Sequence, residues 1–283
     1  MPGPTQQDAD FCVVEPTGGE TPVLVEVPHA GLSALATELA TLAAPASSLA
    51  RDADLYVDEL YADAPAEGAT LLYSRVSRYV CDLNRAASDL DTLATRDLPT
   101  RGPVTPAPHG LVWRSTTDGT PALHRPLTRE QVEARLTRLY RPYHERIGLI
   151  LERKRQRFGY AILVCGHSMP SRGRPDALGQ SVERADVVPG SRGHSSADRR
   201  VIEVPAEQAR ELGWSVAHDQ PYRGGFSTGH YGRPQQGLHA VQIELARRLY
   251  MDEQSLARKP NDFNKTRDYC RRVVARIGAL KLA

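Results

Sequence analysis

Two apolar runs in this chain each lead to a histidine that is flanked by small residues. The run 23–27 continues through Pro28 to His29, and the run that begins at Tyr160 leads to His167. Short apolar runs that stop at such turns are typical of buried β-strands. In open α/β sheets, ligands bind at the carboxyl ends of the parallel strands. We therefore expect both imidazoles at the edge of a sheet where a ligand would bind.

The remainder of the chain alternates between strand-like and helix-like patterns after a loose polar lead-in of about ten residues. Besides the run at Tyr160, we expect strands over 22–28, 69–75, 78–83, 214–218 and 239–245. We expect helices over 32–43, 54–64, 128–157, 196–212 and 262–280. Because strands and helices alternate, the chain is predicted to be an α/β protein with a largely parallel or mixed sheet.

The strongest helix signals belong to the segment 128–157. Thr128 is a candidate N-cap with Gln131 three residues later, and Gly159 is a candidate stop. Pro142 lies inside this segment and has no N–H to donate, so we expect it to kink or divide the helix.

Composition excludes several classes of protein. The 283 residues carry 36 Lys and Arg against 34 Asp and Glu, a net charge of +2, so neither a nucleic-acid partner nor a membrane partner is expected. Four cysteines lie far apart without a CxxC spacing, which favours a reduced, cytoplasmic protein over a cysteine-rich zinc module. The N-terminus has no apolar signal core, and the length suits one catalytic domain over 1–283.

A metal site is one interpretation of the two histidines. Each histidine alone is explained as well by a turn residue that bonds to backbone, but two at equivalent strand ends favour metal binding, since imidazole is a common zinc ligand. Asp52, Asp54 and Asp58 are the candidates for a third ligand. They precede or open a predicted helix, where Asp also serves as a cap. Their spacing does not choose among them.

Glu244 lies in the middle of the apolar run 239–245. An unpaired buried carboxylate is costly, so its presence needs an explanation. One explanation is an ion pair with Arg247 or Arg248. The other is catalytic: Glu244 would be a general base that takes a proton from water at a metal.

Arg85 follows the predicted strand 78–83 and would point into the same cleft as the histidines. Its planar guanidinium matches a carboxylate, and the neighbouring Asn84 adds a donor. The alternative is a structural contact between Arg85 and Asp82.

Three loops offer further candidates. The long segment 86–126 has no periodicity, and structureless runs of this length are often functional lids. A loop over 170–195 and a glycine-rich loop over 221–237 come later. Arg223 and Arg233, both in the last of these, could bind an anionic substrate.

Taken together, these segments resemble the N-formylglutamate amidohydrolase family. The matching stretches follow the family order over nearly the whole chain: 28–31, 54–61, 77–85, 140–144, 166–170, and from 222–226 through 250–253. The resemblance implies a three-layer α/β/α sandwich with a mixed central sheet. It also implies a phosphorylase/hydrolase-like fold and a site similar to those of the zinc carboxypeptidases.

The same resemblance implies roles for individual residues. His29, Asp54 and His167 would bind one zinc ion per chain, with cobalt or manganese as alternative metals. Glu244 would be the catalytic glutamate. Three protein ligands would leave an open position on the metal, as in catalytic zinc sites.

The implied reaction is zinc-dependent hydrolysis of N-formyl-L-glutamate to formate and L-glutamate, in histidine degradation. In this scheme Arg78 stabilises the oxyanion, Asn84 and Arg85 hold the α-carboxylate, and Arg223 or Arg233 meets the distal carboxylate. The alternatives are hydrolysis of another N-acyl amino acid or a short peptide-like amide, or a non-catalytic amino-acid-binding module. The expected partner in each case is a small molecule.

Overall fold

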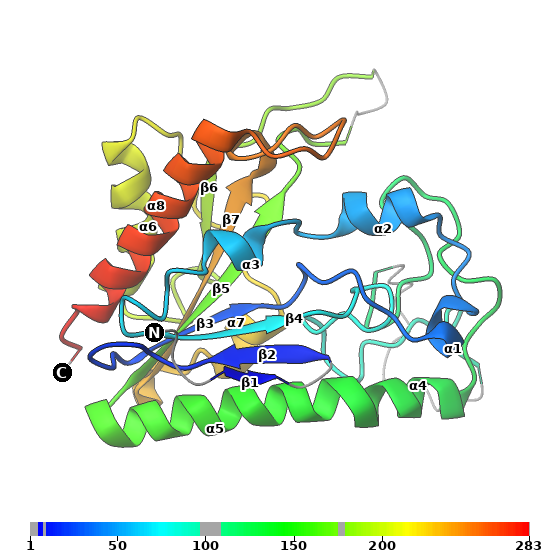
Figure 1. Cartoon of the computed structure of the whole chain (residues 1–283), viewed down its shortest axis with the longest axis horizontal. Helices are drawn as coiled ribbons and strands as arrows, with labels where there is room; N and C mark the ends of the chain where they lie inside the picture. Colours follow the sequence, from blue (N-terminus) through cyan, green and yellow to red (C-terminus); the bar gives the residue numbers. More distant parts are fainter. Residues whose placement is uncertain (1–4, 8–9, 97–108, 175–178, 283) are drawn as a thin grey trace.

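Seven strands form one sheet in the computed structural model, which describes residues 5–7, 10–96, 109–174 and 179–282. The strands are β1 (Thr5–Gln7), β2 (Phe11–Val14), β3 (Val23–Val27), β4 (Thr70–Ser74), β5 (Ala161–Met169), β6 (Val187–Gly190) and β7 (Leu238–Ala246). Their spatial order is β1-β2-β4-β3-β5-β7-β6 (Figure 1). The central strands β4, β3, β5 and β7 are parallel, whereas β1, β2 and β6 pair antiparallel. The mixed α/β sheet predicted from the sequence is confirmed.

Helices cover both faces of this sheet. The α-helices are α1 (Ala36–Leu39), α2 (Ala46–Asp52), α3 (Val57–Leu60), α4 (Arg129–Arg135), α5 (Arg141–Phe158), α6 (Arg199–Glu211), α7 (Phe226–Tyr231) and α8 (Pro260–Gly278). Shorter segments are the π-helical η1 (Leu136–Tyr140) and the 3-10 turns η2 (Pro234–Gln236) and η3 (Arg247–Leu249). On one face lie α3, α6 and α8, and on the other lie α5 and α7, which gives three layers (Figure 1).

The two covered faces explain the apolar character of the central strands. In β3, Val23, Val25 and Val27 pack under one helical layer, while Leu24 packs under the other. A parallel sheet buried on both faces requires nearly continuous apolar strands. Glu26 is the exception in β3, since this carboxyl is fully buried and accepts a hydrogen bond from the Ser227 hydroxyl at 3.0 Å.

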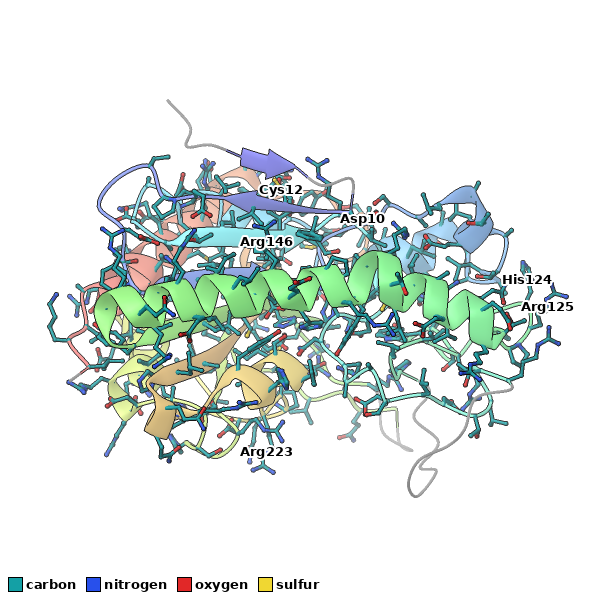
Figure 2. The ribbon with its side chains drawn as sticks, turned by 90° about the horizontal axis from the view of Figure 1, so that it is seen from below. Asp10, Cys12, His124, Arg125, Arg146 and Arg223 are labelled. Carbon is teal, nitrogen blue, oxygen red and sulfur yellow. The ribbon has the colours of Figure 1, made fainter. Side chains whose placement is uncertain are left out.

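The long helical segment follows its sequence signals. The Thr128 hydroxyl accepts a hydrogen bond from the Gln131 N–H, and Gly159 ends the helix with φ of 82°. Around Pro142 the expected division takes the form of the π-helical segment η1 between α4 and α5. A wider helical turn accommodates a residue without an N–H, so the helix still crosses the whole molecule (Figure 2).

Several local predictions are wrong. Residues 78–83 form turns and not a strand, because the Asp82 N–H bonds to Leu111 and the Val80 N–H turns back to Ser77. The expected strand 214–218 contributes only a single bridge between Val216 and Val187.

Other strands were not foreseen: β1 and β2 lie within or just after the supposed lead-in, and β6 lies within the supposed loop 170–195. The helices expected over 32–43 and 54–64 shrink to the single turns of α1 and α3.

The segment 86–126 is anchored where the structure describes it. Leu111, Val112 and Trp113 are buried in the core, while 97–108 lie outside the described residues. Among the described helices, none is both long enough and apolar enough to cross a bilayer.

Candidate active site

A cavity of about 1180 Å³ opens at the carboxyl ends of the central parallel strands. His29 reaches it just after β3, His167 near the end of β5, and Glu244 near the end of β7. The register pairs His167 directly with Glu244 on the neighbouring strand. The parallel order β3-β5-β7 therefore brings three distant parts of the sequence to one edge, as expected for an open α/β sheet.

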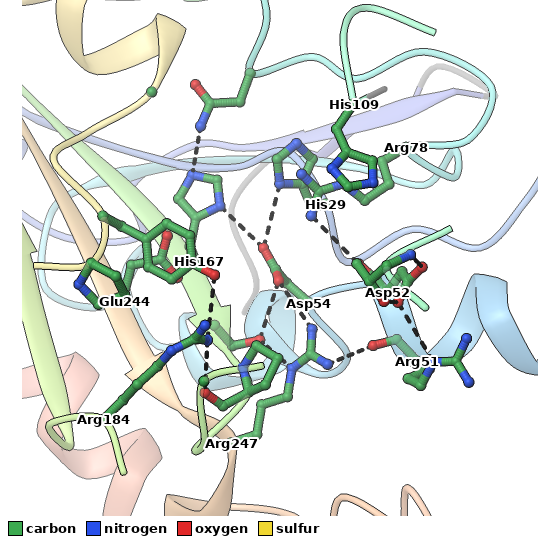
Figure 3. Close-up of a pocket in the computed structure, with 18 of the residues that line it drawn as sticks. His29, Arg51, Asp52, Asp54, Arg78, His109, His167, Arg184, Glu244 and Arg247 are labelled. Atoms are coloured by element: carbon green, nitrogen blue, oxygen red, sulfur yellow. Dashed lines mark hydrogen bonds and ion pairs between the residues drawn. The ribbon is translucent and has the colours of Figure 1, made fainter. Parts of the chain in front are cut away.

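His29, Asp54 and His167 form a tight cluster in this cavity (Figure 3). Oδ2 of Asp54 lies 3.4 Å from Nδ1 of His29 and 3.1 Å from Nδ1 of His167. All three side chains are buried. The Asp54 N–H donates to the His29 carbonyl at 3.0 Å, which fixes the segment after α2 against the end of β3. The structure thus groups Asp54, and not Asp52 or Asp58, with the histidines.

Asp52 has a different environment although it is two residues away. Its carboxylate accepts hydrogen bonds from the Tyr79 hydroxyl at 2.5 Å and from the Thr117 N–H at 3.0 Å. It therefore fastens the segment around Thr117 to α2. Asp58 lies in the first turn of α3, next to Glu59.

Further groups hold the cluster in place from outside. Nε2 of His29 bonds to Oδ1 of Asp82 at 2.8 Å, and the Asp54 Oδ1 accepts from the Ser168 hydroxyl at 3.3 Å. Arg247 lies 3.5 Å from the same Asp54 oxygen. Burial favours a raised pKa for Asp54, but the hydrogen bond from His167 and the proximity of both imidazole rings outweigh burial and lower the pKa. Asp54 is therefore an anion at neutral pH.

The donor set fits a divalent metal ion. Nδ1 of His29 is buried and has no hydrogen-bond partner among the described residues. Because Nε2 of the same ring donates to Asp82, Nδ1 carries the free lone pair. Two imidazoles and one carboxylate match the donors of catalytic zinc sites, which keep a fourth position open.

Glu244 has no ion-pair partner among the described residues. Arg247 instead donates to the backbone carbonyls of residues 51 and 53, and Arg248 pairs with Asp186 at 2.8 Å. The Glu244 carboxylate accepts one bond from the Gln242 amide at 2.8 Å. Burial, the largest influence, raises the pKa of Glu244 to about 7, and His167 partly opposes the rise. A carboxyl of this pKa exchanges protons readily near neutral pH.

Arg78 lines the cavity and is held firmly. Its guanidinium donates to Asp82 at 2.8 Å and lies 4.5 Å from the centre of the Trp113 ring. Asp82 therefore bridges Arg78 and His29. The sequence suggested that Asp82 contacts Arg85, but the arginine that pairs with the Asp82 carboxylate is Arg78.

Arg85 and Asn84 both line the cavity but are held in different ways. The Arg85 guanidinium donates to two backbone carbonyls, those of His109 and Asn84, both at 2.9 Å. In contrast, the Asn84 amide is buried and contacts Nε2 of His167 at 3.3 Å, while its oxygen accepts from the Ser227 N–H. A Cβ at Gly225 would lie 2.3 Å from this amide. Close packing thus makes Asn84 a support for His167.

The two loop arginines do not converge on the cluster. Arg233 precedes η2 and is not among the residues that line the cavity. Arg223 lines it, but its side chain is exposed, its NH2 group lies near Gly193, and it projects from the molecular surface (Figure 2). Arg184 lines the same cavity and was not foreseen, since it falls in the supposed loop 170–195.

The sequence also gave no role to Asp82 as a partner of His29. The only feature of the sequence that pointed to Asp82 was its position three residues before Arg85 and shortly after the apolar pair at 79–80. His109 was missed for the same reason that the loop 86–126 was left unassigned, namely its lack of periodicity. It lines the cavity and its ring lies 4.4 Å from that of Trp113.

Known proteins resemble this chain over most of its length. A family model described as N-formylglutamate amidohydrolase matches residues 21–251. The chain is 34% identical to the N-formylglutamate deformylase of Pseudomonas aeruginosa over 241 residues, which cover 84% of this chain and 85% of that protein. For the N-formylglutamate deformylase of Pseudomonas putida, the identity is 33%, covering 83% and 84%.

A solved structure is similar as well. The crystal structure of N-formylglutamate amidohydrolase from Ralstonia eutropha JMP134 superimposes with a TM-score of 0.87 at 30% identity. The match covers 96% of this chain and 98% of that one.

Proposed function

The chain belongs to the N-formylglutamate amidohydrolase family, and we propose that it hydrolyses N-formyl-L-glutamate to formate and L-glutamate in a zinc-dependent reaction. The observation that carries the proposal is the buried cluster of His29, Asp54 and His167 beside Glu244. A protein that only binds amino acids has no need of an unpaired carboxyl next to such a cluster. The named relatives support the choice of substrate.

His29, Asp54 and His167 would hold the metal. A bound zinc ion would act as a Lewis acid and would lower the pKa of a water molecule towards 7. Asp82 and Ser168 keep the His29 ring and the Asp54 carboxylate in fixed orientations through the hydrogen bonds described above. Such outer partners reduce the motion of the donor atoms.

Glu244 is the proton carrier of the proposed reaction. Its carboxylate accepts a proton from the attacking water as the new C–O bond forms at the formyl carbon. When the C–N bond breaks, the same carboxyl returns that proton to the leaving amine of glutamate. A pKa of about 7 suits both steps, because the group is neither a strong acid nor a strong base at neutral pH.

Two arginines that line the cavity, Arg78 and Arg85, would assist. Arg78 is fixed on Asp82, so it can stabilise the developing oxyanion without reorganising. Arg85, whose guanidinium is held by two backbone carbonyls and pairs with no carboxylate among the described residues, would bind the α-carboxylate.

The fold and the cellular setting are part of the same proposal. We expect one catalytic domain over 1–283 with a fold related to that of the zinc carboxypeptidases. The resemblance to the family favours a place in histidine degradation. A cytoplasmic location is favoured by the four cysteines, which are all free and buried.

A substrate panel tests the proposal. Zinc-loaded protein is assayed with N-formyl, N-acetyl and N-succinyl derivatives of glutamate, aspartate, glutamine and methionine, with and without a chelator. We expect the highest kcat/KM with N-formyl-L-glutamate and no turnover after chelation. A clear preference for another acyl group would change the substrate, and activity that resists chelation would refute the metal dependence.

A further inference from the structure

Many arginines line the cavity, but they differ in how their charge is balanced. Arg51, Arg78 and Arg247 each lie within 4 Å of a carboxylate, those of Asp118, Asp82 and Asp54 respectively. An arginine that is already paired with a carboxylate of the protein can still donate to an oxyanion that forms during the reaction, but it gains less from binding a permanent carboxylate of the substrate. The arginines that have no carboxylate partner are therefore the better candidates for binding one.

Arg184 lines the cavity without such a partner in the described part of the chain. Its NH1 group donates to the Pro170 carbonyl at 3.0 Å and lies 3.4 Å from the Tyr222 hydroxyl. The guanidinium also lies 5.4 Å from the centre of the Tyr222 ring, in a cation–π arrangement. Its NH2 and Nε groups have no partner among the described residues and remain available to an anion.

The backbone at Arg184 is fixed as well. Its N–H donates to the Ser171 carbonyl at 2.9 Å, and its own carbonyl accepts from the Arg248 guanidinium at 2.9 Å. Arg248 is in turn paired with Asp186. A guanidinium supported in this way loses little conformational freedom when it binds a ligand.

Tyr222 connects Arg184 to the proposed reacting centre. Its side chain packs against a small apolar cluster that contains Met169 and Ala246, the last residues of the strands that carry His167 and Glu244. Burial raises the pKa of Tyr222, the Glu244 charge raises it further, and Arg184 partly opposes the rise. The Tyr222 hydroxyl thus lies within the field of both side chains. Figure 3 shows the Arg184 guanidinium pointing from the edge of the pocket towards the cluster.

The position of Arg184 differs from that of Arg85. Arg85 reaches the cavity from the loop that follows β4, next to His109. Arg184 reaches it from the segment just before β6, on the far side of β7. Two cationic groups from different sides of one cavity suit a substrate with two carboxylates. Arg223, the candidate from the sequence, has its guanidinium near Gly193 at the surface.

We propose that Arg184, supported by Tyr222, binds the side-chain carboxylate of the substrate and makes the site selective for acidic N-formyl amino acids. The inference rests on the proposed function, since it assigns a residue to one end of that substrate. Arg85 then remains for the α-carboxylate, which all N-formyl amino acids share.

Paired substrates test this assignment. N-formyl-L-glutamate and N-formyl-L-glutamine have nearly the same shape and differ in one charge, so the ratio of their kcat/KM values isolates recognition of the side-chain carboxylate. In Arg184→Gln we expect this ratio to fall by about 10- to 100-fold, because one charge-assisted contact is lost. The fall should come mainly from a higher KM for N-formylglutamate, with N-formylglutamine little affected. Arg184→Lys, which keeps the charge but not the planar fork, should lose less.

Arg210→Gln serves as the matched control, because Arg210 is an exposed arginine of α6 that does not line the cavity. It should leave the ratio unchanged. An unchanged ratio in Arg184→Gln, or an equal fall with both substrates, overturns the assignment while the amidohydrolase activity stands. If the unaltered protein hydrolyses neither substrate, the proposed function fails and the assignment fails with it.

Discussion

Buried charges occur at both ends of the central parallel strands, but they are balanced in different ways. At their amino ends, the fully buried Lys154 of α5 donates to Glu20 at 3.1 Å and to the Thr21 carbonyl at 2.9 Å, just before β3. Arg153 and Arg157 complete an ion-pair group around Glu20. At this amino end, each buried charge meets a partner of the opposite sign.

At the carboxyl ends of the strands, where the cavity opens, the pairing of buried groups is incomplete. Among the described residues, Glu244 is buried without an ion-pair partner, and Nδ1 of His29 is buried without a hydrogen-bond partner. Unpaired buried groups cost folding free energy, so a site that keeps them has a use for them in binding or chemistry. The comparison teaches that the completeness of pairing, and not the presence of charge, distinguishes a structural cluster from a candidate site.

Of the changes considered at the candidate site, removal of the metal should cause the largest loss of activity. After exhaustive chelation we expect hydrolysis of N-formylglutamate to fall to background and to return when zinc is added. His29→Ala should lose both bound zinc and activity, as measured by elemental analysis and formate release. Stoichiometric zinc in that variant would contradict the proposed ligand set.

The second largest loss of activity should follow from replacing Glu244, the unpaired buried carboxyl. Glu244→Gln keeps the shape of the side chain but cannot carry the proton, so kcat should fall about 10²- to 10⁴-fold. Zinc content should stay the same. Glu26→Gln is the matched control, because Glu26 is also a buried strand carboxyl and burial also raises its pKa. Glu26→Gln should keep its turnover, and full turnover in Glu244→Gln would show that Glu244 is not the base.

A smaller effect is expected from the outer partner of His29. Asp82→Asn removes the charge that faces Nε2 of His29, so zinc affinity should weaken about 10- to 100-fold. Competition with a fluorescent zinc chelator measures this change. Unchanged affinity would show that Asp82 only holds Arg78 in place.

The smallest effect is expected from the ion-pair group around Glu20, at the amino ends of the strands, and it should change stability alone. Burial favours a raised pKa for Glu20, but Lys154, Arg153 and Arg157 outweigh it and lower the pKa. A lowered folded pKa stabilises the protein above the ordinary value of about 4.3, and this contribution disappears as the pH falls through the folded value. Glu20→Gln should therefore reduce the free energy of unfolding by about 1–2 kcal/mol at pH 7, a modest loss because Glu20 is partly exposed. In acid the loss should be smaller, because the carboxyl of Glu20 is then protonated.

Urea unfolding at pH 7 and at pH 3 measures that difference, and kcat should not change. A loss that is the same at both pH values would mean that the carboxylate charge at the amino end does not stabilise the fold.

Local patterns in the sequence were enough to predict the strands β3, β5 and β7 and the helix that starts after Thr128. Periodicity and caps act over a few residues, so they can be recognised without the fold. The same patterns predicted that His29 and His167 lie at one edge of the sheet, because the carboxyl ends of parallel strands meet there.

Only the tertiary structure decided which acid joins the histidines and which arginines face the cavity. Asp52 and Asp54 are nearly equivalent in sequence, but a bond across 113 residues brings Asp54 to His167 while Asp52 turns to Tyr79. Asn84 lines the cavity and contacts His167, and Arg184 lies in a segment with no periodicity. Contacts between distant segments depend on how helices and loops pack around the sheet, and spacing along the chain does not encode that arrangement.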